Sequence, residues 1–187
     1  MTIRLSDKAE AQIEEIKKRY PSARSAIMPA LYIAQEELGI LSNEAIEWAA
    51  DRIGIAPVAA HEVATFYTMF YKRKLGRYHF QVCRTLPCAL RGAKKISQCL
   101  HKILGVAPNV VTADGLFSFE EVECLGSCGT APMCQVNDTF FENLTPEKLE
   151  DIISRIRETS PVLSYSTIND TLGEGLAGYP KSEVVKD

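Results

Sequence analysis

Six cysteines are the residues of this 187-residue chain whose type and spacing are suited to chemistry. Four of them form two close pairs: four residues separate Cys83 from Cys88, and three separate Cys124 from Cys128. Each pair closes a short loop, so that two sulfurs can bind one metal atom, and the fold can bring two such loops together. These four thiols are therefore the candidate metal ligands.

The spacing favours an iron-sulfur cluster over other uses of cysteine. A [2Fe-2S] cluster takes four thiolates, two on each iron. Structural zinc also takes four thiolates, but zinc knuckles have two to four intervening residues and mostly two. A thioredoxin-type enzyme needs a C-x-x-C pair at a helix start, which the sequence lacks. On spacing alone zinc, thiol redox chemistry and unligated cysteines stay open as alternatives.

A cluster of this kind makes electrostatic demands on the loops that hold it. With two ferric ions, two sulfides and four thiolates its formal charge is about −2, and about −3 after one-electron reduction. Gly126 and Gly129, beside Cys128, can adopt positive φ values that turn backbone amides toward an anion. Arg84 can add a nearby cation, although an exposed arginine is the favoured interpretation.

The remaining motifs predict no further site. Cys99 lies on the buried side of a predicted helix and Cys134 enters a predicted strand, so both are interpreted as buried thiols, with a disulfide between them left open. The stretch "GEGLAG" at 173–178 matches the dinucleotide fingerprint, but only nine residues follow it. A second strand and helix cannot be built from them. We predict no catalytic residues.

Composition excludes several classes of function. The chain is 46% hydrophobic with a net charge of −3, and it has no basic stripe interleaved with aromatics, so nucleic-acid binding is not expected. The N-terminal stretch lacks the apolar core of a signal peptide, and no apolar run approaches the ~20 residues that span a bilayer. A cytosolic or peripheral protein without membrane insertion is expected, in which thiols stay reduced.

The elements that must position the cysteines fall into two regions. Up to Phe66 the apolar spacing predicts four short amphipathic helices, at 6–20, 26–38, 43–53 and from Pro57, which would pack as an antiparallel bundle. From Tyr78 a half-buried strand runs into Cys83, followed by a helix, three short strands and a last helix from Thr145. After Ser160 periodicity is lost, which predicts a tail.

With these motifs the chain resembles a known family, the 24 kDa subunits of NADH:quinone oxidoreductase (respiratory complex I), known in bacteria as the E subunits. The resemblance covers 27–157 and rests on "EELGIL", "VATFYTMF", "VCRTLPCALRGA" and "ECLGSCGTAPMCQVN", with 35 residues between the two cysteine pairs. It implies an α+β fold: an N-terminal helical bundle at 1–75, a thioredoxin-like α/β [2Fe-2S] domain at 76–158 and an extended C-terminal tail at 159–187. It also implies that Cys83, Cys88, Cys124 and Cys128 bind one [2Fe-2S] cluster.

The resemblance further implies a division of labour. A partner subunit would bind FMN and NADH, and the cluster of this chain would exchange single electrons with that flavin, so this chain alone has no complete active site. The interface is expected on the N-terminal helices and the tail, and the complex would hold the chain at the inner face of the cell membrane. Two alternatives remain: the equivalent subunit of a soluble NAD-linked hydrogenase or formate dehydrogenase, and a zinc-stabilised interaction module without a redox role.

Overall fold

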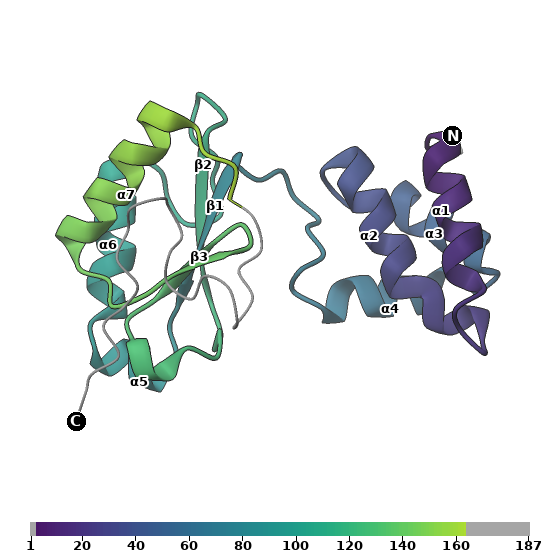
Figure 1. The fold of residues 1–187 in the computed structure, drawn as a ribbon, viewed down its shortest axis with the longest axis horizontal. Coiled ribbons are helices and arrows are strands. Elements are labelled where there is room, and N and C mark those ends of the chain that lie inside the picture. Colours follow the sequence, from purple (N-terminus) through teal and green to yellow (C-terminus); the bar gives the residue numbers. More distant parts are fainter. Residues whose placement is uncertain (1–2, 164–187) are drawn as a thin grey trace. The chain divides into compact units, whose positions relative to one another are not determined.

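The computed structural model describes residues 3–163 and divides the chain into two compact units, one ending at Lys74 and one beginning at Leu75 (Figure 1). Most of the predicted tail at 159–187, together with the "GEGLAG" stretch, lies outside the described residues. Among the described residues no helix combines the length and the apolar character needed to cross a membrane.

The first unit consists of helices around one apolar core. Its elements are α1 (Asp7–Lys17), a 3₁₀ turn (Ala23–Ala26), α2 (Ile27–Leu38), α3 (Asn43–Ile53) and α4 (Pro57–Phe66).

Local capping sets the ends of these helices. The hydroxyls of Ser6 and Ser42 each accept the backbone N–H three residues later, at 3.2 Å, and so begin α1 and α3. Gly39 and Gly54 follow α2 and α3 with φ of 75° and 78°, the left-handed conformation that ends a helix. These predicted helix ends are confirmed.

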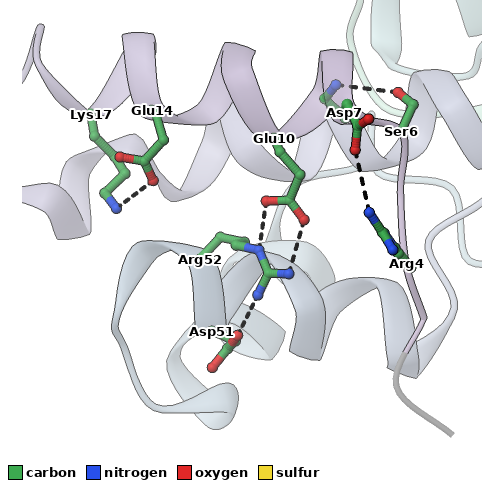
Figure 2. Close-up of polar contacts among 9 residues, drawn as sticks. Arg4, Ser6, Asp7, Glu10, Glu14, Lys17, Asp51 and Arg52 are labelled. Carbon is green, nitrogen blue, oxygen red and sulfur yellow. Dashed lines mark hydrogen bonds and ion pairs between the residues drawn. The ribbon is translucent and has the colours of Figure 1, made fainter.

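An ion pair joins α1 to α3. The Arg52 guanidinium donates to both carboxylate oxygens of Glu10, at 2.6 and 2.9 Å, and a third bond reaches Asp51 at 2.6 Å (Figure 2). The same guanidinium lies 5.6 Å from the centre of the Trp48 ring. Arg52 therefore links two helices and covers the buried tryptophan between them.

The buried stripe of α4 differs from the expected one. Val58, predicted to face the core, is 65% exposed, whereas Ala60 and Ala64 are fully buried. Because these two alanines are four residues apart, they form a narrow smooth face that lets α4 approach its neighbours closely. Leu38, also predicted to be buried, lies at the last position of α2 and is 37% exposed.

The second unit is a four-stranded sheet with helices. Its strands lie in the order β2-β1-β3-β4, with β1 parallel to β2 and antiparallel to β3, and β3 antiparallel to β4. Helices α6 and α7 lie side by side along the sheet (Figure 1). The bounds are β1 (Tyr78–Cys83), α5 (Leu86–Leu90), α6 (Ala93–Leu104), β2 (Phe117–Val122), a 3₁₀ turn (Cys128–Thr130), β3 (Cys134–Val136), β4 (Thr139–Phe141) and α7 (Pro146–Thr159).

The prediction that β1 is half-buried is wrong, because all six of its residues are buried. A strand between two neighbours can be covered on both faces, and its polar side chains then need partners. His79 contacts the Ser118 hydroxyl at 2.8 Å and the Glu120 carboxylate at 3.0 Å. Gln81 donates to the same carboxylate at 3.0 Å.

A short additional helix precedes α6. The sequence predicts one helix from Leu90 onward, but Gly92 has φ of 98° and breaks the segment. The result is α5, a single turn that begins three residues after Cys83, followed by α6. This break places Cys88 on its own helical turn beside the end of β1.

Candidate metal centre

The four candidate ligands lie at one edge of the sheet. Cys83 is the last residue of β1, Cys88 lies in α5, Cys124 follows β2 by two residues, and Cys128 begins the 3₁₀ turn. Because β1 and β2 are parallel neighbours, with Cys83 opposite Val122, their carboxyl ends meet at the same edge. The fold therefore brings together two loops that are far apart in sequence.

The sulfurs of the second loop are spaced as ligands of one metal. The Sγ atoms of Cys124 and Cys128 are 3.8 Å apart. Two thiolates on one tetrahedral ion with metal-sulfur bonds of about 2.3 Å would also lie about 3.8 Å apart. In the first loop the Cys83 and Cys88 thiols are hydrogen-bonded to each other.

The thiols come in pairs. Within residues 3–163 no three His, Cys, Asp or Glu side chains are grouped as one ion would need. The two pairs nevertheless interact, since the charge of Cys83 acts to raise the pKa of Cys124 and that of Cys128 acts to raise the pKa of Cys88. Two adjacent pairs are the donor set of a [2Fe-2S] cluster, with two thiolates on each iron, so the residues present fit that group.

One thiol of the first pair is favoured as a thiolate. Burial acts to raise the pKa of Cys83, but hydrogen bonds from the Thr85 hydroxyl, at 3.3 Å, and from the Leu125 and Thr85 amides outweigh it and lower the pKa. Burial and the neighbouring Cys83 raise the pKa of Cys88 to about 11.

The second pair shows the same division. The Gly126 amide donates to the Cys124 sulfur at 3.4 Å and lowers the pKa of that thiol. The hydrogen bond with Cys124 raises the pKa of Cys128. Each pair thus has one thiol prepared to ionise, and metal binding would release the proton of the other.

The two glycines beside Cys128 behave differently from each other. Gly126 has φ of 85° and turns its amide toward a sulfur, as predicted. Gly129 does not have a positive φ, so that part of the prediction is wrong: it lies inside the 3₁₀ turn, whose backbone is right-handed. Arg84 is exposed and pairs with Glu123 at 2.6 Å, in agreement with the favoured interpretation.

A buried carboxylate holds the loop that carries Cys128, and the sequence analysis missed it. Glu142, directly after β4, accepts hydrogen bonds from the hydroxyls of Ser127 and Thr130. The next two residues of the chain donate backbone bonds of 2.7 and 2.9 Å to the carbonyls of Thr130 and Pro132. The only available signal was the pair of hydroxyl residues flanking Cys128, and nothing in the sequence shows that Glu142 meets them.

The two remaining cysteines are free thiols. Cys134 is completely buried in β3 and burial raises the pKa of its thiol, so the predicted burial is confirmed. Cys99 is half-buried against the core, with its sulfur 3.9 Å from the Pro146 carbonyl oxygen. No disulfide joins them.

Comparisons with known proteins agree with this site. A model of the thioredoxin-like [2Fe-2S] ferredoxin family matches residues 13–157. The NADH-quinone oxidoreductase E subunit of Rickettsia bellii is 47% identical over 147 residues, covering 77% of this chain and 88% of the relative. Of Rhizobium meliloti, the E subunit that carries the number 2 is 39% identical over 163 residues, covering 87% and 97%.

A solved structure shares the fold. An NAD⁺-reducing [NiFe]-hydrogenase in its H₂-reduced state matches with a TM-score of 0.64 at 20% identity, over 76% of this chain. The match spans about a quarter of the hydrogenase chain, 24%, so it concerns the fold alone.

Proposed function

This chain belongs to the thioredoxin-like [2Fe-2S] ferredoxin family and to the family of NADH-quinone oxidoreductase E subunits, and from this premise we propose that it is an electron-transfer subunit of NADH:quinone oxidoreductase. The observation that carries the proposal is the meeting of two cysteine pairs at the ends of β1 and β2. The chain contributes to an oxidoreductase as a subunit and holds one [2Fe-2S] cluster.

Cys83, Cys88, Cys124 and Cys128 are the proposed ligands. When bound, the cluster supplies a site that accepts and gives up one electron at a time. The first pair is buried and shields its side of the site from water, whereas the second pair is exposed. The exposed pair leaves one side of the site open to the approach of a redox partner.

The proposed partner is the subunit that binds FMN and NADH. Hydride transfer from NADH to the flavin would belong to that subunit, because a nicotinamide gives up two electrons at once. We assign residues 1–75 to an N-terminal helical bundle that contributes to the interface, 76–158 to the cluster domain and 159–187 to a C-terminal extension. The complex would hold the chain at the inner face of the cell membrane.

A second assembly has one observation in its favour. The fold is shared with a chain of an NAD⁺-reducing [NiFe]-hydrogenase. The same module could therefore serve a soluble NAD-linked hydrogenase or formate dehydrogenase with unchanged cluster chemistry. The identity with the two NADH-quinone oxidoreductase relatives, at 39% and 47%, favours the respiratory complex.

The test is to isolate the native protein anaerobically in mild detergent and to identify the copurifying chains by mass spectrometry. We expect about two irons and two acid-labile sulfides per chain, together with a flavoprotein and membrane subunits. A flavoprotein accompanied only by hydrogenase or formate dehydrogenase subunits would favour the second assembly. A colourless chain with one zinc would refute both.

A further inference from the structure

We propose that Glu142 is a positioning residue for the cluster: its carboxylate fixes the loop that carries Cys128, and its negative charge lowers the reduction potential of the site. This inference rests on the proposed function, because it concerns the same four cysteines. It adds a residue outside both cysteine motifs and from a different segment of the chain.

The first step of the argument is the hydrogen-bond geometry. Ser127 and Thr130 lie on either side of Cys128 in the sequence, and both hydroxyls donate to the same oxygen of Glu142, Oε1. The two hydroxyl oxygens are also only 2.8 Å apart. One carboxylate oxygen therefore ties together the residue before Cys128 and the second residue after it.

The backbone beyond Glu142 completes this attachment. Asn143, with φ of 47°, donates its N–H to the Thr130 carbonyl at 2.7 Å, and Leu144 donates to the Pro132 carbonyl at 2.9 Å. The segment after β4 thus pairs with the segment after Cys128. These bonds act on the loop from its far side, whereas the bonds already described, from Gly126 to sulfur and between the two sulfurs, act at its exposed end.

The second step is the burial of the carboxylate. Glu142 is only 8% exposed, and within residues 3–163 its other oxygen, Oε2, has no hydrogen-bond partner. No arginine, lysine or histidine among the described residues forms an ion pair with it. A buried charge without a counter-ion acts over a longer range than an exposed one, because water does not screen it.

The third step is the effect on the site. A [2Fe-2S] cluster on four thiolates is negative and becomes more negative when it accepts an electron, and its potential depends on nearby charge and on hydrogen bonds to sulfur. A buried carboxylate beside it disfavours the added electron. The hydroxyls of Ser127 and Thr130 are engaged by that carboxylate and so are directed away from the sulfurs. Both effects lower the potential.

The experiment compares four versions of the full chain with the cluster bound: wild type, Glu142→Gln, Glu142→Ala and the matched control Glu150→Gln. Glu150 is exposed on α7, so the control removes one carboxylate charge in water. Midpoint potentials are measured by anaerobic titration followed by absorbance and electron paramagnetic resonance. Loss of the cluster to an iron chelator is followed in the same samples.

Glu142→Gln should raise the midpoint potential and retain the cluster, because the amide oxygen still accepts from both hydroxyls. Glu142→Ala should raise the potential and lose the cluster about tenfold faster or more, as expected when support of a metal ligand is removed. Glu150→Gln should match wild type in both measurements. If Glu142→Gln has the potential of wild type, the charge effect is refuted, and if Glu142→Ala keeps the cluster as wild type does, the positioning role is refuted.

A separate measurement keeps this result distinct from the proposed function. Hydrogen exchange of the amides at 124–130 is compared in the same proteins, and Glu142→Ala should exchange faster there than Glu150→Gln. A wild-type chain without a [2Fe-2S] signal would refute the proposed function, while the exchange data would still decide whether Glu142 fixes the loop. If Glu142→Ala does not fold, Ser127→Ala replaces it with the same expected loss of protection.

Discussion

At the scale of single residues, the six cysteines have the same side chain but different surroundings. Cys83 and Cys124 receive hydrogen bonds that lower the pKa of their thiols, and each is paired with a second cysteine. Cys99 and Cys134 are affected mainly by burial, which raises the pKa of both. Since a metal binds the thiolate, these surroundings separate ligands from bystanders without reference to spacing.

Cys124→Ala should abolish the cluster, whereas Cys99→Ala should leave its spectrum intact. The first change removes a thiolate from a pair whose sulfurs are 3.8 Å apart, and the second removes a half-buried sulfur on α6. Iron content and visible absorbance of the two purified variants measure the difference. The reverse pattern would show that the ligand assignment is wrong.

At the scale of elements, the site depends on the close approach of β1 and β2. Gly76 lies just before β1, and its N–H donates to the Ser118 hydroxyl at 2.8 Å. A Cβ atom at Gly76 would lie 2.3 Å from the Phe117 carbonyl carbon and 2.6 Å from the Ser118 nitrogen. Both atoms are backbone atoms of the paired strand, so they can move only if the strand moves.

Gly76→Ala should therefore destabilise the second unit by about 3 kcal/mol, the upper range for overpacking a close contact. Denaturant unfolding followed by circular dichroism and by bleaching of the cluster measures the effect. Gly129→Ala is the control, because a Cβ there meets nothing within 4 Å and its φ is not positive. Equal stability of the two variants would mean that the strands separate without cost.

The link between α1 and α3 gives a prediction that depends on pH. Hydrogen bonds from Arg52 lower the pKa of Glu10, against a smaller opposing effect of burial. A lowered folded-state pKa stabilises the protein above the ordinary glutamate value, near 4.3, and this contribution is lost as the pH falls through the folded value. Both side chains are 32% exposed, so screening by water limits the contribution to about 1 kcal/mol.

Glu10→Gln should lower the free energy of unfolding of the first unit by about 1 kcal/mol at pH 7 and by almost nothing near pH 2. Trp48 is the only tryptophan in the chain and is buried in the first unit, so its fluorescence reports this unit alone. Glu14→Gln, which breaks an exposed pair with Lys17, should have almost no effect at either pH. A difference between Glu10→Gln and wild type that is equal at both pH values would contradict the ion-pair explanation.

The same elements show what sequence alone can predict. Helix ends were predicted correctly at Ser42 and Gly54 because a cap is a local interaction within four residues. The burial of His79 was missed because it depends on the position of β1 inside the sheet and on partners about 40 residues away. Glu142 was missed for the same reason, since its hydroxyl partners precede it by 12 and 15 residues.

At the scale of the whole molecule, the chain has two cores that share no residue. One core is built from residues between Leu5 and Phe70, and the other from residues between Tyr78 and Ile156. All four candidate ligands and Glu142 belong to the second unit. A unit with its own core can fold alone, so cluster binding should be a property of the second unit.

A fragment of residues 75–187 should therefore fold and bind the cluster without the first 74 residues. We expect the iron content, visible spectrum and midpoint potential of the full chain, because the deletion removes no strand of the sheet and no residue of the site. The same fragment with Cys124→Ala should be colourless, which controls for nonspecific iron. A folded but colourless fragment, under conditions in which the full chain is loaded, would show that the helices of the first unit help to build the cluster site.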